Sequence, residues 1–482
     1  MLEAAATTFE VLPSQNSLGL GQDAVQVQKV FGPLKTTVLM LKQNKLKICL
    51  ISSHITLHTR YLCETIRKEV AAILGIPTIN VLVMSAHNHC AVHPSDEPTL
   101  CWWHGERQSR GDSLNKTGKD FVNKLGKAVR KLPDDLVPVN VSYACGKEGR
   151  ISYNRKGRHD DGSTYMMREE DRGLLGKDFR GEIVEDAPVV MLKNDQGNVV
   201  CSIVQYTAHP VTAYHPERPV VCGEYPQAAC DQLAAHLSAN HAGSPVPVAF
   251  FQGCAGNINT KGFLSGDVER SERYGRYLGQ TYRKACRHLK ASQTNELRYE
   301  TARSRLPYAR LPSQQTLARE LDEIKQFVRR AREGDDDTFS CVGLNFPRAF
   351  TPQYRGKLAE AILPWTRWAL RKVREDKHGG LPSHLETEVY ALRLGNVGII
   401  GMEGEPFLGI GQQIQERSPM ALTIPCGYTN VSYGYIPDGA NTGDREYMSA
   451  FYRYTRYRPP FRKPAGDVWA TTAVRLLEKL HD

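Results

Sequence analysis

Residues 79–90, INVLVMSAHNHC, contain a β-rich run that ends in a polar segment with two histidines. Residues 59–77 precede this run, and their apolar side chains recur every four positions until Gly75 and Pro77, which predicts an amphipathic helix. Before the helix, residues 36–53 form two β-rich runs around a polar turn, which predicts a hairpin. The order of strand, helix and strand predicts an α/β layer.

The same kinds of segment recur further along the chain. Residues 189–205 predict a second hairpin that leads into Y-T-A-H-P, and residues 224–237 predict a helix. A buried strand at 246–252 then leads into a loop of small residues at 253–262. A third hairpin is predicted at 388–407, with its turn at Gly395. We therefore expect an α/β fold of mixed β-sheets layered with helices.

Helices are also predicted at 313–332, 363–373 and 466–480. The first two form a helical insertion, about 312–378, between β-rich portions. We find no internal repeat and no linker rich in Pro, Gly or Ser, so we expect a single domain over residues 1–482.

Composition narrows the class of protein. The 482 residues are 41% apolar, which suits a globular chain, and the formal net charge is +10. The densest basic stretches are 116–131, whose lysines have roughly helical spacing, and 456–463. A solvated helix face is the best explanation, so we expect no nucleic-acid partner. The start of the chain has no secretion-type pattern, and no run of about 18 apolar residues occurs. We expect a cytoplasmic protein without stable membrane association, whose 12 scattered cysteines stay reduced.

The two histidines at the end of the first strand are candidate metal ligands. His87 and His89 lie two apart, and such side chains point to the same side of a strand, although many histidine pairs serve only packing. His209 and Glu405 lie at the ends of other predicted strands. Zinc draws its nitrogen and oxygen ligands from such separate segments.

Seven short motifs follow one another in an order that resembles the neutral/alkaline, non-lysosomal ceramidase family, and most closely its shorter bacterial-type members. The motifs are H-x-H at 87–89, N-R at 154–155, A-H-P at 208–210, E-Y-P at 224–226, Q-G-x-A-G-x-I-N at 252–259, G-E at 404–405 and G-x-T-N-V-x-x-x-Y at 427–435. The resemblance implies the fold of the ceramidase N-terminal domain, and we expect no C-terminal β-sandwich after it.

The resemblance also implies a site. Its zinc ligands would be His87, His209, Glu405 and Tyr435, and the reaction centre would be lined by His89, Arg155 and Tyr452. Bound Zn²⁺ lowers the pKa of water to about 7 and so supplies a nucleophile for amide hydrolysis. His89 would carry the proton, and Arg155 would stabilise the oxyanion.

Two departures from the family pattern bear on the substrate. Asn259 stands where ceramidases have a serine, and Cys90 replaces the serine after H-x-H. We therefore expect an amide or related acyl bond in a small soluble substrate rather than ceramide, with Asn259 at the reaction centre. A packed thiol explains Cys90 better than a reactive one.

Several alternatives remain open at this point. Glu403 competes with Glu405, because both lie at the same strand end, two residues apart, and are expected to point the same way, although the G-E motif favours Glu405. Tyr433 likewise competes with Tyr435. The chain could also be a metal-containing protein that binds a ligand without turnover. A third possibility is an unrelated H-x-H metal hydrolase of the amidohydrolase-barrel or metallo-β-lactamase type. The further His and Asp ligands that these folds need downstream of H-x-H are not found, and the eight repeated strand and helix units of a barrel are not apparent.

Overall fold

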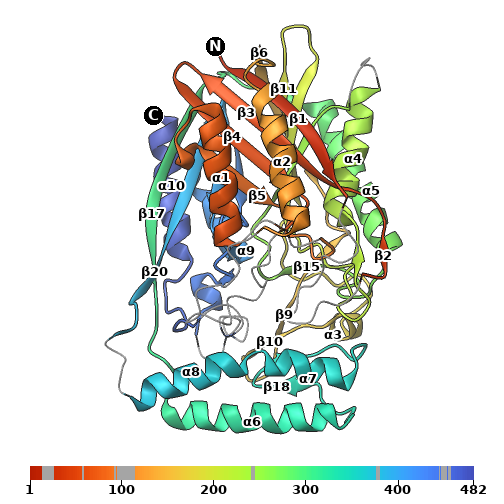
Figure 1. Cartoon of the computed structure of the whole chain (residues 1–482), viewed down its shortest axis with the longest axis vertical. Helices are drawn as coiled ribbons and strands as arrows, with labels where there is room; N and C mark the ends of the chain where they lie inside the picture. The colour runs from red at the N-terminus through yellow and green to blue at the C-terminus, as the bar shows by residue number, and fades with distance from the viewer. Residues whose placement is uncertain are drawn as a thin grey trace.

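The structure is a computed structural model of the chain (Figure 1). It describes residues 1–12, 27–56, 59–91, 94, 114–239, 245–375, 380–443, 446, 453 and 457–482. Within these residues the fold is α/β, with three mixed sheets, each covered by helices.

The first unit begins at the N-terminus. Its sheet has the order β5-β4-β3-β1-β6, in which β3 and β4 form the predicted hairpin and β5 is parallel to β4. Gly75 ends α1 with φ at 62°, as predicted from its place after the apolar repeat. The elements are β1 Glu3–Val11, β3 Leu34–Gln43, β4 Leu46–Ser53, α1 Arg60–Leu74, β5 Val81–Ser85, α2 Lys116–Lys131 and β6 Val137–Pro138.

Two further units repeat this order of three strands, a helix, a parallel strand and a second helix. The second unit contains β7 Asn140–Lys147, β11 Asp186–Lys193, β12 Val199–Tyr206, α4 Glu224–Ser238, β14 Val248–Gln252 and α5 Val268–Ala285, with β16 Lys290–Ala291 at its edge. The third contains β17 Leu297–Pro307, β20 His384–Leu394, β21 Val397–Met402, α9 Leu408–Arg417, β23 Leu422–Cys426 and α10 Asp467–His481. The structure therefore holds a threefold repeat of topology that sequence analysis missed, because the three units share the order of elements and not their residues.

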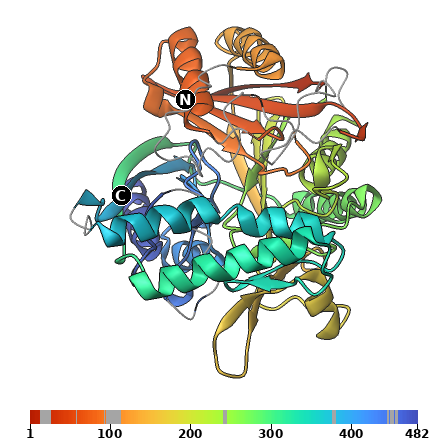
Figure 2. The same cartoon turned by 60° about the horizontal axis from the view of Figure 1, so that its bottom comes forward.

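The three sheets share one apolar core. A single cluster of buried side chains includes Leu39 of β3, Ile203 of β12 and Ile399 of β21. The other side of each sheet packs against its own helices through a separate cluster. Figure 2 shows the three units grouped around a common centre.

Insertions and short ribbons complete the fold. Between β17 and β20 lie α6 Gln314–Arg332, α7 Pro352–Glu360 and α8 Leu363–Arg374, of which α6 and α8 were predicted and α7 was not; they cross one end of the molecule in Figures 1 and 2. The predicted loop 253–262 contains a strand, β15, that pairs with β8. The remaining elements are β2 Lys29–Val30, β8 Ser152–Asn154, β9 Lys156–Arg158, β10 Thr164–Met166, α3 Glu169–Leu174, β13 Val220–Val221, β15 Ile258–Thr260, β18 Ser340–Cys341, β19 Leu344–Asn345, β22 Glu405–Pro406 and β24 Tyr435–Ile436, with 3₁₀ turns at Thr78–Asn80, Cys286–His288 and Gly439–Asn441.

Two expectations can be compared directly with this architecture. The described strands form separate sheets and no closed barrel, so the barrel alternative raised by H-x-H is wrong. Among the described helices, none combines the length and apolar character that a bilayer crossing requires.

His54, directly after β4, gives the fold a dependence on pH. Burial, reinforced by the Lys35 cation, lowers the pKa of His54 to about 3, against about 6.5 in an unfolded chain. Between these values the unfolded chain binds a proton that the folded chain does not, so the stability from neutral His54 falls as pH decreases below about 6.5.

We predict that His54→Gln removes this part of the pH dependence. Between about pH 7 and pH 5 the wild type should lose about 2 kcal/mol of unfolding free energy more than the variant does, by linkage. Urea unfolding at both pH values measures the difference. Equal losses in the two proteins would contradict the assignment.

Candidate metal centre

The H-x-H motif lies in a turn after β5. Strand β5 ends at Ser85, and His87 has a left-handed φ of 58°. The alternation of side chains along a strand therefore does not align His87 with His89, contrary to the prediction. The imidazoles still converge, with their Nε2 atoms 3.3 Å apart. Buried Asn88 holds the turn because its amide donates to the carbonyls of His54 and Cys222 at 3.2 and 2.7 Å.

His209 follows β12, and its ring is oriented by the backbone. Its Nδ1 lies 2.7 Å from the carbonyl oxygen of Ala255 and 3.1 Å from that of Ile258. Carbonyl oxygens only accept hydrogen bonds, so Nδ1 must carry the proton. Burial lowers the pKa of His209 to about 4, so the ring is neutral at pH 7 and its Nε2 carries a lone pair.

The Glu405 carboxylate contacts both His87 and His209. Its Oε2 lies 3.1 Å from Nε2 of His209 and 3.2 Å from Nε2 of His87. Burial by itself raises the pKa of Glu405, but the facing His87 and His209 imidazoles hold it well below its usual range. An ionised carboxylate oxygen only accepts hydrogen bonds, so its lone pairs face the lone pair of His209 Nε2. With the His209 proton on Nδ1, a cation between the two atoms would stabilise this contact.

Glu403 does not share this direction, contrary to the expectation that both glutamates point the same way. Its carboxylate accepts hydrogen bonds from the Tyr390 hydroxyl at 2.8 Å and the Glu388 amide at 3.1 Å. Gly404, with φ at 148°, turns the chain between the two glutamates, and Glu405 pairs with Tyr435 in the β22–β24 ribbon. The backbone turn therefore separates two residues that looked equivalent in the sequence.

The spacing of the ligand atoms fits a small cation. In a tetrahedral zinc site with bonds of about 2.0–2.1 Å, ligand atoms lie about 3.3 Å apart. The three contacts among His209, Glu405, His87 and His89 are 3.1, 3.2 and 3.3 Å. The ligand atoms of the three histidines lie within 4.8 Å of one another. These histidines could therefore hold a metal, and Glu405 contributes an oxygen to the same place.

Tyrosines close the site on one side. The Tyr435 hydroxyl interacts with Arg155 and Glu405, and burial raises its pKa to about 12. Tyr433 lies elsewhere, because its hydroxyl accepts a 2.6 Å hydrogen bond from Arg60 of α1. Of the two tyrosines left open by the sequence, Tyr435 is the one at the candidate site.

Tyr428 is a site residue that sequence analysis missed. Its ring centre lies 4.4 Å from that of His87, and its hydroxyl lies 3.5 Å from Nε2 of His209. Like His87, it has a left-handed φ, at 55°, and it stands at the same distance after the parallel strand of its unit. The G-x-T-N motif that contains Tyr428 could have indicated a site residue. The left-handed backbone conformation that turns the Tyr428 side chain toward His87 could not be predicted from the sequence.

Arg155 and Asn259 lie together beside Tyr435. The Arg155 guanidinium, buried with its residue, donates to the Gly256 carbonyl at 2.6 Å and to the Asn259 side-chain oxygen at 3.3 Å. Its Cζ is 5.0 Å from the Tyr435 ring centre. A permanent cation therefore lies next to the candidate ligands.

Cys90 and Tyr452 are the remaining candidate residues. Cys90 is buried, and burial, with Cys222 and Glu224 nearby, raises the pKa of its thiol well above the usual range, which agrees with a packed thiol. Tyr452 lies outside the described residues.

Solved structures of other proteins share this fold. The structure is similar over 99% of the chain to the crystal structure of neutral ceramidase from Pseudomonas aeruginosa, with a TM-score of 0.60 and 12% sequence identity, covering 75% of that chain. It is likewise similar to a ceramidase complexed with C2, with a TM-score of 0.64, 12% identity and the same two coverages. No protein-family model and no curated protein matches the sequence. The likeness shows a ceramidase-like fold.

The two glutamates provide a matched test of the metal centre. We predict that Glu405→Gln weakens zinc binding more than about 100-fold, because it removes a ligand charge, and loss of outer-shell partners alone costs 10- to 100-fold. Glu403→Gln, an equally buried change, should leave the affinity unchanged. Zinc titration with a competing chelator, together with melting curves of both variants, measures this. Equal affinity in the two variants would exclude Glu405 as a ligand.

Proposed function

We propose that the protein is a zinc-dependent hydrolase that cleaves an amide or related acyl bond in a small soluble substrate. The contact between His209 Nε2 and Glu405 Oε2 is the observation that supports it most, because two lone-pair atoms 3.1 Å apart in a buried site need a cation between them. The ceramidase-like fold and the ordered motifs agree with this reaction class.

We assign the ligands as the sequence resemblance implies. His87, His209 and Glu405 supply two nitrogens and one oxygen, a set that suits zinc. Tyr435 is the proposed fourth ligand. When bound, Zn²⁺ acts as a Lewis acid that lowers the pKa of water to about 7.

The other residues have proposed roles around the reacting bond. His89 is neutral at pH 7, because burial and the neighbouring His87 lower its pKa well below the usual range, so it can accept a proton. Arg155 is held by Gly256 and Asn259 and can donate to the oxygen on which negative charge develops. We keep Tyr452 as a proposed substrate contact.

Asn259 sets the proposal apart from ceramide hydrolysis. Its side chain is fully buried and bonded to Arg155, so its role is to position that guanidinium, and it has no hydroxyl for attack on a carbonyl. The same observation favours a second candidate function, a metal-containing protein that binds a ligand without turnover.

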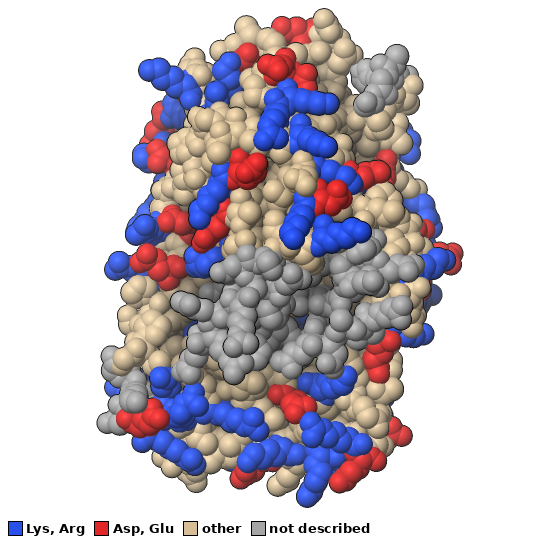
Figure 3. All heavy atoms as spheres, viewed as in Figure 1, with Lys and Arg blue, Asp and Glu red and all other residues tan. Residues whose placement is uncertain are grey.

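The setting of the reaction is part of the proposal. We propose a cytoplasmic enzyme without a nucleic-acid partner or stable membrane association. On the face drawn in Figure 3, Lys and Arg side chains are interspersed with Asp and Glu side chains, which supports the absence of a nucleic-acid partner. The eleven described cysteines are all free, nine of them buried, which agrees with a reducing compartment.

The first test is metal dependence. Protein dialysed against a chelator should lose hydrolysis of a panel of N-acyl and ester substrates, and stoichiometric Zn²⁺ should restore it. Full turnover by protein shown to be metal-free would refute the mechanism. Bound zinc with no turnover across the panel would instead favour the ligand-binding alternative.

Arg155 provides the second test. We predict that Arg155→Ala lowers kcat about 10²- to 10³-fold, as loss of one oxyanion donor does, while zinc content stays the same. Arg158→Ala, an exposed change in the neighbouring strand β9, is the control and should retain kcat. An unchanged kcat in Arg155→Ala would remove Arg155 from the proposed chemistry.

A further inference from the structure

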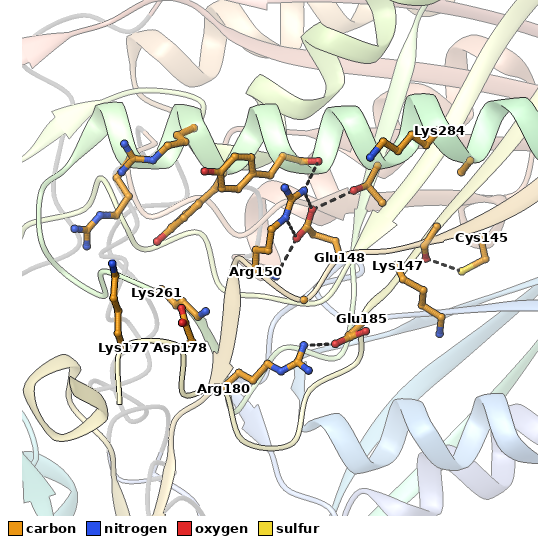
Figure 4. A pocket seen from close by; sticks show the side chains of 18 of the residues that line it. Cys145, Lys147, Glu148, Arg150, Lys177, Asp178, Arg180, Glu185, Lys261 and Lys284 are labelled. Carbon is orange, nitrogen blue, oxygen red and sulfur yellow. Dashed lines mark hydrogen bonds and ion pairs between the residues drawn. The ribbon is translucent and has the colours of Figure 1, made fainter. Parts of the chain in front are cut away.

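A cavity of about 1100 Å³ lies in the second unit, and its lining does not include the candidate metal ligands. It is bounded by the end of β7, the loops after β7 and α3, and one face of α5 (Figure 4). The polar and aromatic lining residues of α5 recur at intervals of three and four and so share one face of the helix: Arg270, Arg273, Tyr274, Tyr277, Thr281 and Lys284. None of the proposed metal ligands lines this groove.

The groove is strongly basic, with nine Lys and Arg residues against three Asp and Glu residues in its lining. Five of the nine cations are compensated by a carboxylate of the described chain. These pairs are Lys147–Asp186, Arg150–Glu148, Arg172–Glu169, Arg180–Glu185 and Arg270–Asp267. The pairs account for most of the local negative charge and hold part of the lining in place.

Four cations in the lining have no such compensation. Lys177, Lys261, Arg273 and Lys284 have no carboxylate within 4.0 Å in the part of the chain that the structure describes. Asp178 is the one lining carboxylate there without an ion pair. Burial, with Arg172 and Arg180 nearby, lowers the pKa of Lys261, although Asp178 and Glu169 act in the opposite direction. The groove therefore has a surplus of positive charge.

The surplus is spread along the groove. Arg273 and Lys284 are eleven residues apart on α5, a rise of about 16 Å. In Figure 4 the labelled Lys177 and Lys261 lie together, and Lys284 lies at the opposite end of the view. A single small anion would reach one end only, whereas an extended anion would reach both.

We propose that this groove binds an extended small anion that carries several phosphate groups. Lysine ammonium groups bind phosphate as point charges, and arginine adds hydrogen bonds of fixed geometry. The uncompensated cations line one cavity of about 1100 Å³, a volume that suits a small ligand better than a nucleic-acid strand. This site is independent of the proposed hydrolysis.

Calorimetry of the full chain with inorganic tripolyphosphate tests the proposal. We expect binding of one ligand per chain that weakens as salt increases. Lys177→Gln combined with Lys284→Gln, both exposed positions at the two ends, should weaken it at least about tenfold. Lys127→Gln, an exposed change of the same charge on α2, should leave it unchanged.

Further measurements distinguish the sources of binding. Glu405→Gln should bind tripolyphosphate as the wild type does, which separates the groove from chelation at the metal centre. Inorganic phosphate should bind more weakly than tripolyphosphate. Absence of binding, equal losses in Lys127→Gln, or binding only to vesicles of anionic lipid or to a single-stranded oligonucleotide would each overturn the proposal.

Discussion

The packing of three sheets on one apolar cluster is the constraint on which the rest of the structure depends. Each sheet contributes side chains to this cluster and covers its other face with helices of its own unit. Buried sheets on this scale are stabilised mainly by the apolar area removed from water. Once the sheets share a core, the turns after their parallel strands must meet, and residues from all three units become neighbours.

Polar side chains from the three units lie together at this meeting point, where they are buried from water. His87, His209 and Glu405 come from three different units, and each is buried. Buried lone pairs without donors are costly, so such an arrangement is stable only with a proton or a cation among them. The hydrogen bonds of His209 Nδ1 place its proton on the far side of the ring, so Nε2 faces Glu405 with a lone pair, which supports the proposed metal centre.

Much of the fold could be predicted from the sequence, because hairpins, helix stops and apolar periodicity are local signals. The predicted hairpin at 36–53 and the helix ending at Gly75 are both present. The candidate ligands came from ordered motifs, and the structure brings His87, His209 and Glu405 together. Sequence could not reveal the threefold topology or the basic groove, since both depend on contacts between distant segments.

The turn that carries His87 shows why local pattern fails at the site itself. Ser85 and Cys426 end the parallel strands β5 and β23, and two residues later His87 and Tyr428 both adopt left-handed φ values. The two turns are hydrogen-bonded to each other, from the Ser85 amide to the Tyr428 carbonyl at 3.1 Å. Non-glycine residues hold such conformations only where surrounding contacts enforce them. The first and third units thus contain the same kind of strained turn, which orients His87 in one and Tyr428 in the other. Tertiary packing determines this orientation.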